Sequence, residues 1–168
     1  HNGFSWEYST LIRKISYKEG RLEAVAKGSV PGTIDDSFSI DEYEGNLRVV
    51  TTDESAIGLY ILDPDLKEIG RLDNLAKGEQ VYSARLMGDT GYFVTFRNTD
   101  PLFSADLSDP ENPQILGELK IPGFSEYLHP YGEGRLLGIG MDADEETGAT
   151  GGVKLSMFNV SDPADVKE

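Results

Sequence analysis

The sequence predicts an all-β fold that is built from repeated antiparallel meanders. Two observations lead to this prediction. Short strand-like segments follow one another through Gly91–Gly140, and Gly, Pro, Asn or Asp stands at the joints between them. Weaker copies of the same pattern flank this stretch on both sides. We therefore expect about thirteen β-strands and almost no α-helix.

The spacing of the copies defines the repeat. Corresponding strands recur at intervals of roughly 40–50 residues, which is the length of a four-stranded propeller blade. Equivalent strands begin at Ser37, Val81 and Phe124, and another set begins at Ile57, Leu102 and Val153. The turn DLSDP at Asp106–Pro110 returns as NVSDP at Asn159–Pro163. The pattern predicts β-propeller blades, and an unrelated β-sandwich with frequent turns is the alternative fold.

The repeats place residues 1–168 in a single incomplete propeller of about three to four blades. The expected units are a partial blade over 8–30, blades over 37–72 and 81–121, and a blade over 124–168 that lacks its outer strand. Propellers contain typically 4–8 blades in a closed ring. An arc of this length is therefore expected to leave a blade face and strand edges without a neighbour at each end.

Exposed strand edges and large apolar faces favour association. We therefore predict that chains associate, with contacts at Phe4–Tyr17 and Val153–Val166, and that the backbone of Val153–Val160 has free donors and acceptors. The alternative is that Phe4–Tyr8 folds back as a substitute strand.

The composition is strongly acidic. The 168 residues include 30 Asp and Glu against 15 Lys and Arg, which gives a formal net charge of −15. Such a surface repels phosphate backbones, so nucleic acid is not an expected partner. It also disfavours anionic membrane surfaces, whereas cations and basic protein patches are compatible with it. No apolar run approaches the ~20 residues that span a bilayer, so the sequence predicts no transmembrane segment.

The sequence contains no cysteine. Disulfides, thiolate metal sites and cysteine nucleophiles are therefore excluded, while the compartment is left open. No signal peptide opens the chain, so for an exported protein the signal would lie outside this sequence.

Three stretches resemble prokaryotic secreted proteins, bacterial and archaeal, that contain a C-terminal β-propeller domain. They are Val30–Thr52, Met87–Pro130 and the GIG at Gly138–Gly140. The DLSDP turn is also similar to the LVIVD-type propeller repeat of bacterial surface proteins. The resemblance implies a propeller fold, a secreted or cell-envelope location and no established catalytic activity. It supplies no functional residues.

The acidic segment Met141–Gly152 is the candidate metal site. Asp142, Asp144 and Glu146 place hard oxygen donors on a Gly-rich loop, which suits Ca²⁺. The segment lacks the Gly and the Glu that an EF-hand has at its sixth and twelfth positions, so it is not an EF-hand. The alternative is a solvated loop between two strands.

Other polar residues suggest structural roles. His129 has no second histidine or Ser-His-Asp arrangement beside it, so we expect its side chain to tie an inner strand to a neighbouring backbone. The Ser-Asp-Pro turns are expected to be Asx-type turns. Of the three inner strands, two carry Asp41 and Glu126, while the third carries Arg85, which does not suggest a cage of carboxylates.

Three classes of function remain. The first is an extracellular or cell-envelope scaffold that binds a protein or small ligand on one face of the propeller. The second is a Ca²⁺-dependent propeller hydrolase acting on esters or glycans, and the third is a purely structural module. The sequence shows no catalytic constellation and no phosphate-binding glycine loop, so we predict the first.

Overall fold

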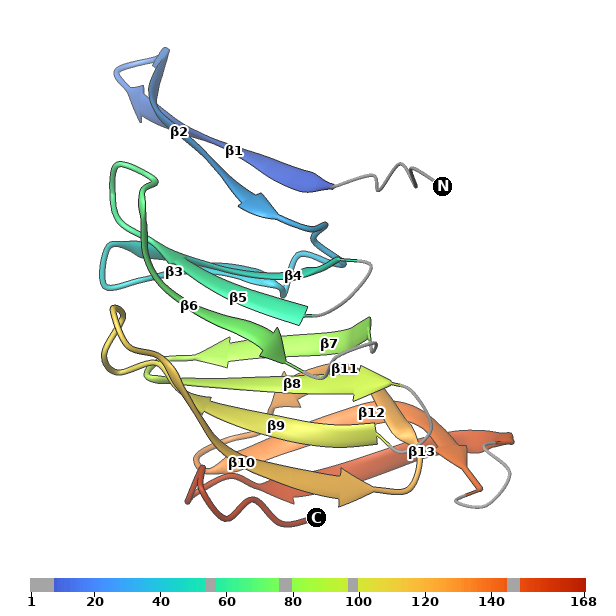
Figure 1. The fold of residues 1–168 in the computed structure, drawn as a ribbon. Helices are drawn as coiled ribbons and strands as arrows, with labels where there is room; N and C mark the ends of the chain where they lie inside the picture. Colours follow the sequence, from blue (N-terminus) through green and yellow to red (C-terminus); the bar gives the residue numbers. More distant parts are fainter. Residues whose placement is uncertain (1–7, 54–56, 76–79, 97–99, 145–148) are drawn as a thin grey trace, which may run out of the picture.

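The computed structural model describes residues 8–53, 57–75, 80–96, 100–144 and 149–168. In these residues it contains thirteen β-strands and no helix, in four separate antiparallel sheets (Figure 1). The predicted all-β propeller architecture is therefore confirmed. The four sheets stack one on another, and no sheet joins the first of them to the last.

Each sheet is a meander in which consecutive strands pair. The N-terminal hairpin consists of β1 (Ser9–Lys18) and β2 (Arg21–Pro31). The second sheet contains β3 (Ile40–Tyr43), β4 (Asn46–Thr52), β5 (Ile57–Leu62) and β6 (Glu68–Leu75). The third contains β7 (Gln80–Met87), β8 (Thr90–Phe96), β9 (Asp100–Asp106) and β10 (Gln114–Ile121). The fourth contains β11 (Phe124–Pro130), β12 (Arg135–Ala143) and β13 (Thr150–Asn159).

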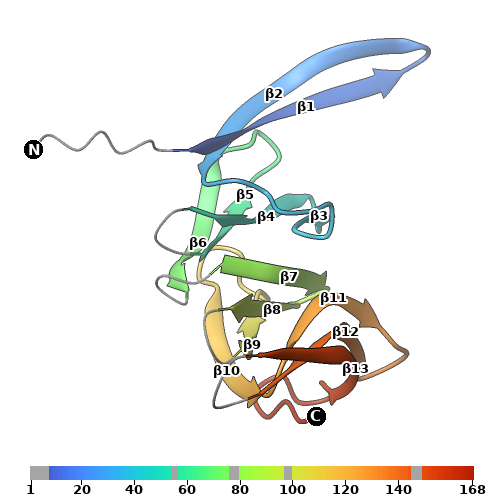
Figure 2. The same cartoon turned by 90° about the vertical axis from the view of Figure 1, so that its right-hand side faces the viewer.

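The first strands of the second, third and fourth sheets lie along one side of the stack, and β6 and β10 lie along the other (Figure 2). The inner strands touch one another: β7 contacts β11, and the Ser83 hydroxyl donates a hydrogen bond to the Ser125 carbonyl at 2.7 Å. We call the side formed by β3, β7 and β11 the axial side. It corresponds to the centre of a propeller.

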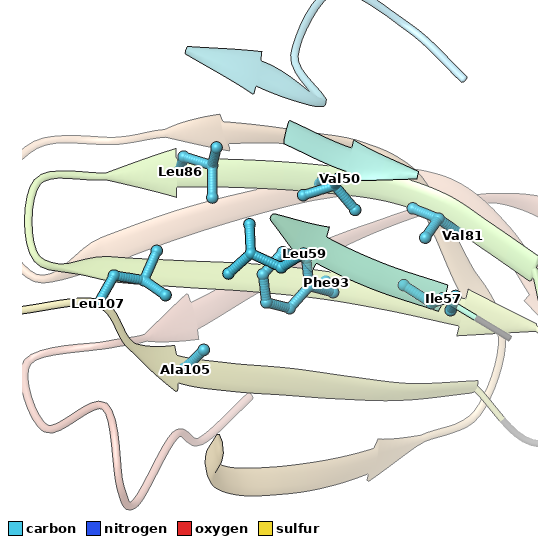
Figure 3. Close-up of a cluster of buried hydrophobic side chains, with 9 residues drawn as sticks. Val50, Ile57, Leu59, Val81, Leu86, Phe93, Ala105 and Leu107 are labelled. Carbon is cyan, nitrogen blue, oxygen red and sulfur yellow. The ribbon is translucent and has the colours of Figure 1, made fainter. Parts of the chain in front are cut away.

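The hydrophobic core lies between the sheets in three layers. One layer, between the second and third sheets, contains Val50, Leu59 and Phe93 (Figure 3). Successive residues of a strand point to opposite faces, so Val49 packs in a different layer, against the hairpin, and Tyr92 packs toward the fourth sheet. The central strands must therefore be apolar on both faces, which explains the uninterrupted buried run of β5.

Two strands begin later than the sequence suggests. The strand expected from Ser37 begins at Ile40, because the Asp36 carboxylate accepts hydrogen bonds from the amides of Phe38 and Ser39 and holds them in a turn. The strand expected from Leu66 begins at Glu68. Leu66 adopts a left-handed conformation (φ 61°) within a turn, although its side chain is buried.

The two ends of the stack present apolar side chains to solvent. On the hairpin, Leu11 and Tyr17 are each 74% exposed, and Ile15 and Leu22 are also exposed. On the fourth sheet the exposed side chains are Ile139, Val153, Leu155 and Met157. We call these the hairpin face and the β13 face.

The outer edge of β13 is not entirely free. Asn159 and Lys167 exchange two backbone hydrogen bonds, at 2.7 and 3.2 Å. The Glu168 carboxylate accepts a hydrogen bond from the Ser156 hydroxyl and forms an ion pair with Lys154 at 2.9 Å. The expectation of free backbone groups along Val153–Val160 is thus wrong at Asn159, because the residues after the turn come back along the strand.

Candidate functional site

The axial side brings together an arginine and two aromatic rings from three different sheets. The Arg85 guanidinium of β7 lies 4.3 Å from the centre of the Phe38 ring and 5.5 Å from that of Tyr127. The two rings are tilted against each other, with 5.2 Å between their centres. Phe38 comes from the turn before β3, and Tyr127 from β11. The three side chains thus connect elements that are far apart in the sequence.

Arg85 also contacts the backbone of the neighbouring sheet. Its Nε donates a hydrogen bond of 2.8 Å to the Leu128 carbonyl of β11. Arg85 and Tyr127 are half-buried, whereas Phe38 is exposed at its edge. A cation over an aromatic face contributes about 0.5–1 kcal/mol at exposed sites and more where water is excluded. Arg85 therefore both fastens β7 to β11 and presents a positive charge on the axial side.

His129 extends this group of side chains along β11. Its Nδ1 lies 3.1 Å from the Tyr127 hydroxyl, and the imidazole is exposed to solvent. The expected tie to a neighbouring backbone is not what the structure shows, because His129 bonds to the side chain two residues before it on the same strand. We call Phe38, Arg85, Tyr127 and His129 the axial cluster.

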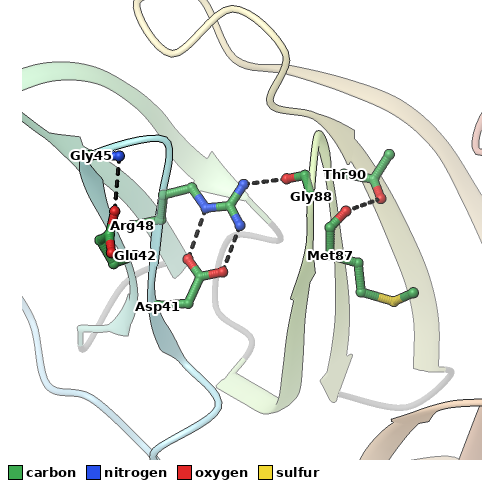
Figure 4. A network of polar contacts seen from close by, with 7 residues as sticks. All are labelled: Asp41, Glu42, Gly45, Arg48, Met87, Gly88 and Thr90. Carbon is green, nitrogen blue, oxygen red and sulfur yellow. Dashed lines mark hydrogen bonds and ion pairs between the residues drawn. The ribbon is translucent and has the colours of Figure 1, made fainter.

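The second inner-strand residue, Asp41, is held in an ion pair. Arg48 is 2% exposed and meets the Asp41 carboxylate through two parallel hydrogen bonds, from Nε at 2.8 Å and from Nη2 at 2.6 Å. Arg48 Nη1 donates to the Gly88 carbonyl in the β7–β8 turn (Figure 4). The pair therefore joins the second sheet to the third. Asp41 is engaged there, and it is not a free carboxylate on the axial side.

Tyr43 completes the contact between these two sheets. The Arg48 guanidinium lies 4.7 Å from the centre of its ring. The negative charge of Asp89 beside the phenol raises the pKa of Tyr43 above its usual value. The Tyr43 hydroxyl thus stays neutral through the ordinary pH range and remains a hydrogen-bond donor.

The predicted metal ligands lie at the β12–β13 connection, away from the axial cluster. Asp142 and Asp144 are both exposed, and the Asp144 amide donates to the Ala149 carbonyl at 3.0 Å. Glu146 lies outside the described residues. Within the described part of the chain, no three acidic or histidine side chains gather closely enough to hold a metal ion. The Ca²⁺ site therefore stays a prediction.

The Ser-Asp-Pro turns are Asx-type turns, as expected. The Asp109 carboxylate accepts from the Glu111 amide at 3.1 Å, and Asp162 accepts from the Ala164 amide at 3.0 Å. Because these side chains serve the turns themselves, they are not components of a ligand site.

The sequence reasoning placed Arg85 on an inner strand but missed its aromatic partners. Phe38 was assigned to a strand, and Tyr127 was not singled out. One signal was available: an aromatic residue precedes serine at the start of each inner strand, in Phe38-Ser39, Tyr82-Ser83 and Phe124-Ser125. The structure shows that Tyr82 and Phe124 also form an aromatic pair, with 4.9 Å between the ring centres.

Stacked antiparallel meanders whose first strands line a common axis define the class of β-propeller proteins. In agreement with this geometry, residues 4–168 match the model of the β-propeller domain family, and the chain belongs to that family.

Two curated relatives are similar to nearly the whole chain. An uncharacterised protein of Methanocaldococcus jannaschii is 48% identical over 151 residues, covering 86% of this chain and 23% of the relative. An uncharacterised protein of Archaeoglobus fulgidus is 49% identical over 160 residues, covering 95% of this chain and 24% of the relative. The chain thus spans about a quarter of the length of these relatives. Among the described residues, no helix has the length and apolar character needed to cross a membrane.

Proposed function

We propose that this β-propeller module is a binding scaffold, and that its axial cluster is the surface that receives the ligand. The observation that carries the proposal is the grouping of Arg85, Phe38 and Tyr127 from three sheets at one partly exposed place. Binding sites commonly combine aromatic surface with a small number of polar groups that fix the orientation of the ligand. The axial cluster has both, and the rigid sheets hold its members in position.

We further propose that the module works outside the cell or at the cell surface. This part of the proposal rests on the resemblance of Val30–Thr52 and Met87–Pro130 to secreted prokaryotic propeller proteins. Protease treatment of intact cells that make a relative of this protein tests it. We expect the propeller region to be cleaved without cell lysis, and full protection while a control surface protein is cleaved would reject this location.

A Ca²⁺-dependent hydrolase has less support. Such an enzyme would place carboxylates around the axis to hold the ion and activate water. Here Asp41 is paired with Arg48, and the corresponding place on β7 holds the cation Arg85. These positions favour recognition of a ligand over metal-assisted hydrolysis.

A panel titration followed by NMR tests the scaffold proposal. The backbone amides and side-chain signals of isotope-labelled protein would be monitored as neutral sugars, organic cations and organic anions are added. We expect at least one chemical class to shift the signals of Phe38, Arg85, Tyr127 and His129 in a saturable way. Phe38→Ala should weaken that binding, and Tyr131→Ala, at an exposed tyrosine outside the axial cluster, should not. If no class shifts the axial signals, the scaffold proposal fails at this site.

A further inference from the structure

We propose that the ligand of the axial cluster carries a carboxylate, and that Arg85 binds this group through the terminal nitrogens of its guanidinium. The inference rests on the proposed binding function and names the chemical class of the ligand. It starts from a contrast between the two arginines on and beside the inner strands.

Arg48 has its hydrogen-bonding capacity used within the protein. Three of its nitrogens are engaged, two with the Asp41 carboxylate and one with the Gly88 carbonyl. Arg85 uses only Nε, which donates to the Leu128 carbonyl. Among the described residues, no carboxylate forms an ion pair with Arg85, and no acceptor bonds to its two terminal nitrogens. In a chain with twice as many acidic as basic residues, a half-buried arginine without a carboxylate is notable.

The geometry of Arg85 suits a planar anion. A guanidinium presents its N–H groups as a rigid fork in one plane, and a carboxylate matches this fork with two parallel hydrogen bonds. The aromatic rings of Phe38 and Tyr127 take part of the water from the group. Partial removal of water strengthens charge-assisted hydrogen bonds. The bond from Nε to Leu128 fixes the direction of the fork, so little rotamer freedom is lost when a ligand binds.

The surroundings limit the charge and shape of the ligand. Arg85 supplies one positive charge in a protein whose net charge is −15, so a monoanion is favoured over a dianion such as phosphate. Asp36, near Phe38, is occupied by the amides of its own turn, and Glu126 is exposed beside Tyr127. The exposed part of Phe38 offers a flat apolar surface next to the guanidinium. We therefore expect a carboxylate attached to a ring.

Benzoate is a suitable probe, because it joins a carboxylate to a flat ring, and benzamide is its uncharged counterpart. Each compound would be titrated into the labelled protein, together with inorganic phosphate in a separate series. We expect benzoate to shift the Arg85 Nε–H, Phe38 and His129 signals at millimolar concentration. Benzamide and phosphate should bind at least tenfold more weakly at this place. This comparison uses the unaltered protein and does not depend on how any variant folds.

Variants then assign the effect to the fork. Arg85→Gln removes the charge but keeps an N–H group that can reach the Leu128 carbonyl, and we expect benzoate binding to fall at least tenfold. Arg85→Lys keeps the charge without the fork and should fall to an intermediate affinity. Arg71→Gln is the matched control, since Arg71 is exposed and paired with Glu68 at 3.0 Å; it should bind as the unaltered protein does.

The outcomes separate this inference from the broader proposal. Equal binding of benzoate and benzamide, tighter binding of phosphate, or benzoate shifts that persist in Arg85→Gln would each overturn the carboxylate assignment. If neutral sugars or organic cations shift the axial signals while benzoate does not, the scaffold proposal stands and only the carboxylate inference fails.

Discussion

Asp106 and Asn159 occupy equivalent places in two repeats and accept the same backbone hydrogen bond. The Asp106 carboxylate accepts from the Ser108 amide at 2.9 Å, and the Asn159 side-chain oxygen accepts from the Ser161 amide at 3.1 Å. The turn therefore needs an oxygen acceptor at this position and does not need a charge. What differs between the two turns is their response to acid.

The first prediction concerns that response. The hydroxyl and amide of Ser108, which both donate to Asp106, lower the pKa of the carboxyl below the model value of 3.8. A carboxyl with a lowered pKa in the folded state adds stability above its unfolded pKa and loses it as the pH falls through the folded pKa. Asp106→Asn should therefore match the unaltered protein near pH 7 and lose less stability below about pH 4. Urea unfolding at pH 7 and pH 3 measures the difference.

Two further variants control this result. Asp106→Ala removes the acceptor and should cost about 1 kcal/mol at pH 7. Asn159→Asp should introduce into the second turn the acid dependence that Asp106 gives the first. An identical pH profile for Asp106→Asn and the unaltered protein would contradict the assignment.

The second prediction concerns the pair of Asp41 and Arg48. Asp41→Ala leaves a buried guanidinium without its carboxylate, and we expect the free energy of unfolding to fall by about 3 kcal/mol. Arg48→Met should cost less, because the remaining Asp41 carboxylate is 32% exposed and can be hydrated. The double variant should cost less than the two single changes together, since the partners interact. Denaturant titration measures all three.

Glu118→Ala is the control for this cycle. Glu118 forms an exposed ion pair with Lys120 at 3.7 Å, and such pairs contribute about 0–1 kcal/mol. If Asp41→Ala is as mild as Glu118→Ala, the pair does not join the second and third sheets in the way that the geometry indicates.

The third prediction concerns the acidic loop. If Asp142, Asp144 and Glu146 hold Ca²⁺, calorimetric titration will give binding heat and added Ca²⁺ will raise the melting temperature. Asp142→Asn combined with Asp144→Asn should remove both effects, since each change withdraws a charged ligand. Absence of heat, together with unchanged melting in the presence of a chelator, would leave the segment as a solvated loop.

The fourth prediction concerns the two end faces. We expect chains to associate at micromolar concentration, because the hairpin face and the β13 face expose neighbouring apolar side chains. Leu22→Ser and Leu155→Ser should each lower the average mass measured by light scattering. Tyr131→Ser changes an exposed aromatic side chain outside both faces and should leave the mass unchanged. A monomer mass for the unaltered protein would refute association through these faces. The segment Phe4–Tyr8, the alternative cover, lies largely outside the described residues.

The strands could be predicted because they are specified locally. Alternation and turn residues set most of them to within a few positions, and the repeat spacing then indicated their grouping. The exceptions arise where a side chain competes with the strand ladder, as Asp36 does when its carboxylate binds the amides that would otherwise extend β3.

The contacts between sheets were harder to predict. The pair of Asp41 and Arg48 is accessible in principle: the hairpin turn at Glu44-Gly45 places the two residues directly opposite each other. The contact of Arg48 with Gly88, and that of Arg85 with Phe38 and Tyr127, depend on how one sheet is rotated on the next. No local pattern encodes that rotation, so the axial cluster appears only in three dimensions.

The β1–β2 hairpin gives the molecule an electric polarity. It contains five of the 15 basic residues and only two acidic ones, whereas residues 124–168, at the opposite end of the stack (Figure 1), contain nine acidic and three basic residues. The stack therefore carries a dipole along its length, with its positive pole at the hairpin. In the field of an anionic surface this dipole turns the hairpin forward. A protein with a net charge of −15 thus has one end that such a surface attracts, and the approach is oriented before any contact forms.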